Sequence, residues 1–193
     1  MGELFGDVHR ATGRVLARAG VALEAPAEQG CCGALHAHDG DLEFARKLAR
    51  QNIAAFEGSD LPIVVNSAGC GAAMKEYGDL LSGDPRWAAR ARTFAARVKD
   101  PSEYLVEVGA GSPGRLAARV AYQDACHLAH AQGIREQPRA LLRGRPGVSW
   151  WRRPGPTCVA GRPGSTASCS RRCRPSCVRG RPNISGRPGR TSW

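Results

Sequence analysis

Residues 61–71 read Leu61-Pro-Ile-Val-Val-Asn-Ser-Ala-Gly-Cys-Gly71, and this stretch decides the fold class. Its first half is short, apolar and β-branched, which is typical of a strand that is buried on both faces. Its glycine-rich end predicts a turn where the strand finishes, the place at which parallel sheets bind their ligands. Helices are expected on both sides, one from Asp41 as N-cap to about Phe56 and one from about Ala72 to Leu81.

Strands and helices alternate along residues 1–143 on either side of this stretch. Apolar residues recur at helical spacing and Pro stands at the first turn of two expected helices. The further helices are expected at 5–19, 84–98, from 101 and at 138–143, and the further strands at 21–23 and 119–123. This alternation predicts an α/β fold with a parallel sheet covered on both faces.

The basic charge is confined to the end of the chain. The net charge is +11, yet residues 144–193 hold 11 Arg and no Lys, Asp or Glu, which leaves 17 basic and 17 acidic residues before them. Arg, Gly, Pro and Ser dominate this end, and no helical or strand period persists, so it cannot bury a core. We interpret residues 144–193 as a disordered basic tail or, preferably, a segment translated out of frame. Because it lacks the regularly placed aromatic residues of a base-stacking surface, we expect no nucleic-acid partner.

The eight cysteines suit a reducing compartment. The sequence has no run of about 18 apolar residues and no secretory signal, so we expect a cytoplasmic protein whose cysteines act as thiolate ligands.

Four of these cysteines form a constellation. Cys31 and Cys32 are adjacent between two glycines, whereas Cys70 and Cys126 each follow an expected strand. Two neighbouring thiolates suit different irons of one cluster better than a single tetrahedral ion. His127, next to Cys126, and His36, just after the Cys-Cys pair, are candidates for second-shell donors to cluster sulfurs. The alternative is a zinc site made by Cys31, Cys70, Cys126 and His127.

Several motifs together resemble the cysteine-rich Cys-Cys-Gly domain of the iron–sulfur subunit of glycolate oxidase. The similarity covers residues 5–143, and its motifs are Gln29-Gly-Cys31-Cys32-Gly-Ala-Leu-His36, Asn52-Ile, Val64-Val-Asn-Ser-Ala-Gly-Cys70-Gly, Lys75-Glu-Tyr-Gly-Asp-Leu-Leu, Tyr122-Gln-Asp-Ala-Cys126-His and Gln137-Pro-Arg-Ala-Leu-Leu. A more distant resemblance is to the cysteine-rich subunit of heterodisulfide reductase. That family repeats a pattern of one Cys, Cys-Cys-Gly and Cys-x-x-Cys.

The resemblance assigns Cys31, Cys32 and Cys70 as ligands of a first repeat, over residues 1–115, and Cys126 as the first ligand of a second, over residues 116–143. The second repeat's Cys-Cys-Gly is expected near Cys158, yet Val and Ala follow that residue. The first repeat's opening Cys is expected before residue 1, and Ala73 stands where the pattern has another Cys. We therefore expect an iron–sulfur cluster of the 4Fe-4S type with an incomplete ligand set.

The resemblance implies a non-catalytic electron-transfer subunit of a glycolate, or 2-hydroxy-acid, oxidase complex. Electrons would pass from flavin-containing oxidase subunits towards quinone, with the complex peripheral to the cytoplasmic face of the inner membrane. His36 and His127 are the residues expected to tune the cluster. The alternatives are a lactate-utilisation iron–sulfur subunit and a zinc-binding or scaffold fragment without a redox role.

Overall fold

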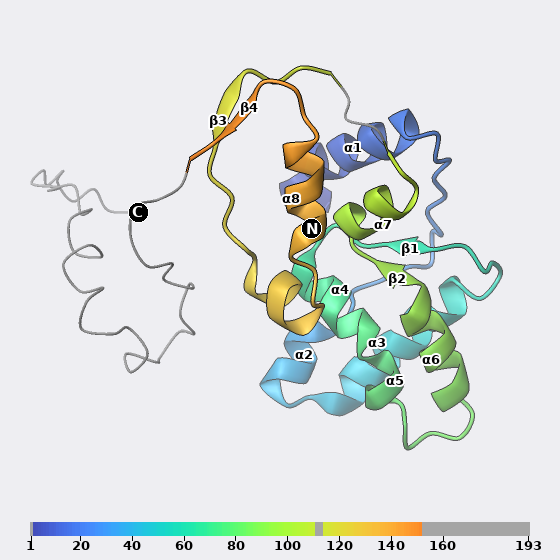
Figure 1. Ribbon diagram of the computed structural model, residues 1–193. Helices are drawn as coiled ribbons and strands as arrows, with labels where there is room; N and C mark the ends of the chain where they lie inside the picture. Colours follow the sequence, from blue (N-terminus) through green and yellow to red (C-terminus); the bar gives the residue numbers. More distant parts are fainter. Residues whose placement is uncertain (1, 111–113, 152–193) are drawn as a thin grey trace, which may run out of the picture. The chain divides into compact units, whose positions relative to one another are not determined.

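The computed structural model describes residues 2–110 and 114–151, with side chains described from residue 5 onward (Figure 1). It has an α/β fold of helices with short parallel strands, as expected. Its elements are α1 (Gly2–Arg18), α2 (Ala34–Asp39), α3 (Leu42–Ala55), β1 (Ile63–Val64), α4 (Ala68–Lys75), α5 (Tyr77–Leu80), α6 (Ala88–Arg97), β2 (Val98–Lys99), α7 (Pro101–Glu107), β3 (Ala118–Val120), the π-helix η1 (His127–Ala131), α8 (Glu136–Arg143) and β4 (Val148–Trp150).

The described strands form two separate parallel pairs. In one pair Ile63 of β1 lies opposite Val98 of β2, and in the other Ala118 of β3 lies opposite Val148 of β4. The expected single sheet is therefore divided within the described residues. The strand expected at residues 21–23 does not form, because Leu23 is 54% exposed and the segment lies beside α1 with no strand next to it.

Two helices begin as their first residues predict. The Asp41 side chain accepts a hydrogen bond from the Phe44 backbone N–H and starts α3. Asp100 forms a capping box with Glu103 at the start of α7, where Pro101 occupies the first turn.

Other boundaries differ from the sequence prediction. The helix expected from residue 72 begins at Ala68, so Cys70 lies in the first turn of α4 instead of in a loop. The helix expected from residue 84 begins at Ala88, since residues 85–87 form a turn. Val98, expected at its end, belongs to β2. The existence of these helices was predictable, whereas their ends depend on tertiary contacts.

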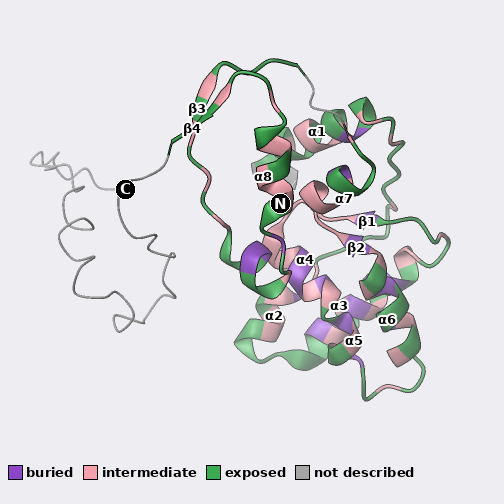
Figure 2. Ribbon diagram, in the orientation of Figure 1, coloured by how far each residue is buried: buried purple, intermediate pink, exposed green. Residues whose placement is uncertain are grey.

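The hydrophobic core lies among α3, α4, α5, α6 and the β1–β2 pair. Figure 2 shows the buried residues gathered in these elements, with fewer in α1 and none in α8. Its members are Ala49, Ile53, Ile63, Met74, Tyr77, Leu81, Ala91, Phe94 and Val98. Cys32 packs against this core, so one of the expected ligands rests directly on the best-packed part of the molecule.

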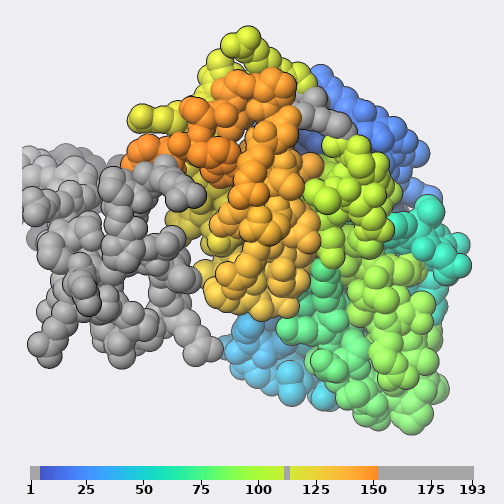
Figure 3. Space-filling model, in the orientation of Figure 1, coloured from blue at the N-terminus to red at the C-terminus, as the bar shows by residue number. Residues whose placement is uncertain are grey.

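Residues 114–151 lie against the first part of the chain mainly through two pairs of helices. The π-helix η1 packs on α4, and α8 packs on α7 (Figure 3). The prediction of a structureless tail from residue 144 is wrong for residues 144–151, because β4 pairs in parallel with β3 through Trp150. The rest of that predicted tail lies outside the described residues, and the repeat boundary near residue 115 stays a prediction. No helix in the described ranges is long and apolar enough to cross a membrane.

Candidate metal centre

The Cys31–Cys32 pair lies on a loop that runs directly into α2. Gly33 ends this loop with a φ of 78° and is the N-cap residue of the helix. A Cβ at Gly33 would lie 3.3 Å from the backbone of Ala45 in α3. The position therefore requires glycine twice over, once for its left-handed backbone and once for its closeness to α3.

A buried asparagine binds the backbone of this loop. Asn52 of α3 is 2% exposed and is the buried polar residue of the described core. Its Oδ1 accepts a hydrogen bond from the Gly30 N–H at 2.9 Å, and its Nδ2 donates to the Cys31 carbonyl at 2.9 Å. One side chain therefore satisfies a donor and an acceptor of the loop, which fixes the backbone path on both sides of Cys31.

A tyrosine continues the same network under Cys32. The Tyr77 hydroxyl donates to the Cys32 carbonyl at 2.8 Å and lies 3.3 Å from Asn52 Nδ2. Its ring stacks on Phe94, with centroids 5.4 Å apart. The loop is thus connected by hydrogen bonds to the aromatic part of the core.

Cys70 approaches the same loop from α4. Burial raises the pKa of the Cys32 thiol to about 12, and a hydrogen bond with Cys70 and the charges of Cys70 and Cys31 act in the same direction. A backbone hydrogen bond at Ala34 opposes them. Cys70 thus lies beside Cys32, which adjoins Cys31 in the loop, and the role of these three residues as ligands of a first repeat stays a prediction.

This donor set fits a cluster of metal ions. Cys31 is exposed, whereas Cys32 and Cys70 are half-buried, so the site has one side open and one side on the core. Bound cations lower the pKa of coordinating thiols and favour the thiolate, which reverses the cost that burial imposes on Cys32. Two adjacent thiols and a third on a facing helix suit several irons better than one ion.

The zinc alternative requires a different arrangement. No group of three His, Cys, Asp or Glu side chains in the described residues is placed to hold one metal ion. Within the described residues, neither the set of Cys31, Cys70, Cys126 and His127 nor the three thiols Cys31, Cys32 and Cys70 are arranged around one metal ion.

The histidines lie apart from the three thiols in their contacts. The His36 ring packs on Phe44, with centroids 4.5 Å apart, and its Nδ1 lies 3.8 Å from Asp41 Oδ2. The His127 ring lies 6.3 Å from that of His38. The expected effect of His36 and His127 on a cluster stays a prediction. The histidine whose ring contacts His127 is His38.

Cys126 is exposed and comes immediately before η1. This segment contacts the α4 helix of Cys70 through Gln132, whose Nε2 donates to the Ala68 carbonyl at 2.9 Å. A Cβ at Gly71 would lie 2.9 Å from the same Nε2, so glycine permits the close approach. The partner cysteine expected near Cys158 lies outside the described residues.

Sequence reasoning missed Asn52 and Tyr77 as site residues. Both lie within the matched motifs, but neither had an assigned role. The available signal was an amide within the apolar face of a helix, since Asn52 lies between the buried Ala49 and Ile53 on α3. A polar residue in such a place needs hydrogen-bond partners from another segment.

Comparison with known proteins agrees with this geometry. Residues 3–75 match the model of the cysteine-rich domain family, named CCG. Residues 3–75 therefore form a cysteine-rich domain of this family.

Several curated relatives carry iron–sulfur or lactate-utilisation names. A probable glycolate oxidase iron-sulfur subunit of Bacillus subtilis is 40% identical over 154 residues, which cover 78% of this chain and 35% of that protein. Lactate utilization protein A of Oceanobacillus iheyensis is 33% identical, covering 76% of this chain and 61% of the relative. The same protein of Lysinibacillus sphaericus is 30% identical, with 78% and 66% covered.

The chain thus spans about a third of the first relative and about two thirds or less of the others. No solved structure matches the chain.

Proposed function

We propose that the chain is the cysteine-rich part of an iron–sulfur subunit in a 2-hydroxy-acid oxidation complex. The observation that carries this proposal is the Cys31–Cys32 loop, whose backbone is held by Asn52 and Tyr77 with Cys70 beside it. The similarity to a glycolate oxidase iron-sulfur subunit and to lactate utilization protein A supports the substrate class. Both glycolate and lactate are 2-hydroxy acids, and these two substrates stay as alternatives.

In this proposal the chain transfers electrons and performs no bond chemistry of its own. Cys31, Cys32 and Cys70 would hold the cluster, of the 4Fe-4S type, which supplies one-electron redox chemistry when bound. Asn52 and Tyr77 fix the carbonyls of the loop, so that both thiols keep one direction. The core beneath Cys32 excludes water from one side of the site, which is one of the factors that set a cluster's reduction potential.

The proposed partners are flavin-containing oxidase subunits, with quinone as the final acceptor and the cytoplasmic face of the inner membrane as the location. The proposed organisation has a first repeat over residues 1–115 and a second beginning at residue 116, with Cys126 as its first ligand. The passage from β3 through α8 to the parallel strand β4 supports a second strand–helix–strand unit there. His36 and His127 are proposed to act on the cluster through neighbouring groups.

Anaerobic reconstitution of the chain with ferrous iron and sulfide tests this proposal. We expect protein-bound iron and acid-labile sulfide, together with a visible absorption band that dithionite bleaches. Cys32→Ser and Cys70→Ser should each remove most of the sulfide, whereas Cys126→Ser should retain it. Stoichiometric zinc without labile sulfide in anaerobically purified protein would instead support the zinc-binding alternative.

A further inference from the structure

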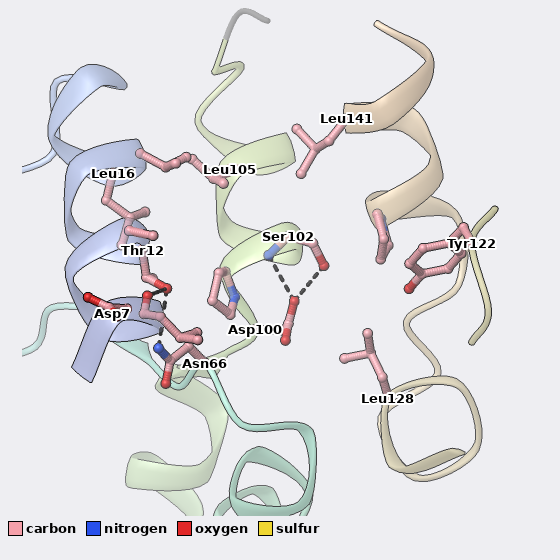
Figure 4. Close-up of a pocket in the computed structure, with 15 residues that line it drawn as sticks. Asp7, Thr12, Leu16, Asn66, Asp100, Ser102, Leu105, Tyr122, Leu128 and Leu141 are labelled. Atoms are coloured by element: carbon pink, nitrogen blue, oxygen red, sulfur yellow. Dashed lines mark hydrogen bonds between the residues drawn. The ribbon is translucent and has the colours of Figure 1, made fainter. Parts of the chain in front are cut away.

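A large apolar cavity lies at the carboxyl ends of β1 and β2. Its volume is about 620 Å³, and it is lined by α1, α7, η1 and α8, with residues that follow β1, β2 and β3 (Figure 4). Val8 and Val15 of α1, Leu105 of α7, Leu128 of η1 and Leu141 of α8 form much of its wall. The cavity is large enough for a small organic molecule with one or two rings.

Its position follows the general rule for parallel sheets. Asn66 comes just after β1 and Asp100 just after β2, so both lie at the carboxyl ends of the paired strands. Cys70 is four residues beyond Asn66, which limits the distance between their Cα atoms to about 15 Å. The cavity and the cysteine site therefore share one edge of the β1–β2 pair, where ligands of such sheets bind.

Two polar groups face the cavity from opposite sides. Figure 4 places Asp100 and Tyr122 across the same hollow. Asp100 Oδ1 accepts a hydrogen bond from the Ser102 backbone N–H at 2.8 Å. Within the described part of the chain, no hydrogen-bond partner is present for Asp100 Oδ2 or for the Tyr122 hydroxyl.

The electrostatic character of the lining selects against organic anions. Among the described residues, the lining includes Asp7 and Asp100 and contains no Lys, Arg or His. The Asp7 side chain is 95% exposed and paired with Arg10 at 2.6 Å, so Asp100 is the carboxylate that a 2-hydroxy acid would meet in the hollow, and the described lining offers no cation to bind it. Burial, followed by the charge of Asp124, raises the pKa of Tyr122 even though the Arg139 guanidinium, 5.1 Å from the ring centroid, acts in the opposite direction, so the hydroxyl stays protonated and can donate.

We propose that this cavity binds a hydroquinone-class molecule, a neutral aromatic ring that carries hydroxyl groups. One ligand hydroxyl donates to Asp100 Oδ2, the Tyr122 hydroxyl donates to an oxygen at the other end, and the ring lies between the leucine and valine side chains. An aromatic ring suits the apolar wall, and two opposed oxygens match the two opposed polar groups.

Binding of this ligand does not depend on the proposed iron–sulfur function. A role of the ligand as electron acceptor does rest on that function. The quinone form takes up two electrons and two protons to become the hydroquinone. Electrons would come from the cysteine-bound cluster of the proposed function, and protons from water at the open side of the cavity. Val8 is 49% exposed and Val15 39%, which leaves that side open within the described residues.

Anaerobic isothermal titration of the full, metal-free chain with trimethylhydroquinone tests the binding directly. We expect one saturable site with a Kd on the order of 0.1 mM, as is usual for a ligand of this size. The dimethyl ether of the ligand keeps the ring but cannot donate to Asp100, and it should bind about 10-fold more weakly. Glycolate and lactate should give no saturable signal.

Three variants and one control locate the site. Tyr122→Phe and Asp100→Asn should each weaken binding by about 3- to 10-fold, since each removes one hydrogen bond to the ligand. Asn keeps an oxygen that can cap α7, which preserves the helix. Ala11→Phe should abolish binding because it fills the cavity. Tyr104→Phe, on the same helix as Leu105 but outside the lining, should change the Kd by less than about 2-fold.

Several results would overturn the proposal. These are the absence of saturable binding up to about 5 mM, binding by Ala11→Phe at the wild-type Kd, or equal binding by the ether. If Ala11→Phe fails to fold by circular dichroism, the comparison of Tyr122→Phe with Tyr104→Phe still decides the question. The cavity would instead belong to an interface between two copies of the chain if three results coincide. The wild-type chain would be a dimer in sedimentation, Ala11→Phe would be a monomer, and neither would bind hydroquinone. Because the metal-free chain is used, failure here leaves the iron–sulfur proposal standing.

Discussion

Cys31 and Cys32 lie on a loop whose backbone is bound by two buried side chains, whereas Cys126 precedes a five-residue π-helix at the surface. The loop rests on the main core. The Cys126 segment is anchored by the buried residues Leu128, Ala129 and Ile134 and by Gln132. The difference shows that this chain carries the positioning machinery for its first group of cysteines within itself. The segment that carries Cys126 depends instead on its contact with α4 through Gln132.

The largest expected effect comes from Asn52→Ala, which removes two hydrogen bonds to the Cys31–Cys32 loop. The Gly30 N–H and the Cys31 carbonyl would lose their partner in a buried place, so the free energy of unfolding should fall by about 2–4 kcal/mol. Urea unfolding measures the fall, and reconstituted sulfide content should drop with it. Gln51→Ala is the matched control, because its exposed side chain makes one hydrogen bond to the Glu28 carbonyl. Equal losses in both variants would contradict the role of Asn52.

Gly33→Ala should have the next largest effect. Alanine would have to adopt a φ of 78° and place its Cβ 3.3 Å from the Ala45 backbone, at a cost of about 1–3 kcal/mol. Gly40→Ala separates the two contributions, since Gly40 has a φ of 91° with nothing near its missing Cβ. Thermal unfolding should show a larger loss for Gly33→Ala. If the losses are equal, close packing against α3 contributes nothing.

The pH dependence of the metal-free chain should be smaller. The native pKa of Cys32 is about 12 against a usual value of 9.0, chiefly through burial. Between these values the unfolded chain has lost the proton that the native chain still holds, so the free energy of unfolding falls as pH rises above about 9. The slope should stay below about 1.4 kcal/mol per pH unit, because Cys32 is half-buried.

Urea unfolding under reducing conditions at pH 8, 9.5 and 10.5 measures this slope. Cys32→Ala should make it shallower, whereas Cys31→Ala should have a much smaller effect, since the charge of Cys31 is the smallest of the causes that raise the pKa of Cys32. Burial also raises the pKa of Tyr77, so part of the decline above pH 10 should remain in both variants and disappear in Tyr77→Phe. A slope that Cys32→Ala does not alter would show that this thiol ionises normally.

The smallest expected effect is that of Gly71→Ala, at the contact between α4 and the segment that carries Cys126. The new Cβ would meet Gln132 Nε2 at 2.9 Å, but this is the end of a flexible side chain that can move. Helix propensity favours alanine by about 1 kcal/mol, so the net change in stability should be within about 1 kcal/mol of zero. Hydrogen exchange should nevertheless increase in residues 126–134 and stay constant in residues 30–33. Faster exchange at both places would mean that the two regions open together.

The sequence predicted much of this fold because its periodic elements are defined locally. The α3 helix begins at Asp41 and α7 begins at Pro101, as their side chains require. The two-residue strand β2 was missed because it has no pattern of its own and exists through pairing with β1. The adjacent Cys31 and Cys32 were singled out from their chemistry, and their role as ligands stays a prediction. Asn52 was not, because its role depends on which loop folds over α3.

The parallel pairing of β1 with β2 and of β3 with β4 has a consequence for the order of folding. Each pair joins residues that are distant in sequence, such as Ile63 with Val98, so it requires closure of a long connection. Contacts of this kind form late and slowly. The α3 helix and the hydrogen bonds from Asn52 to residues 30 and 31 span a shorter connection. A nascent chain would therefore shape the Cys31–Cys32 loop before either strand pair is complete.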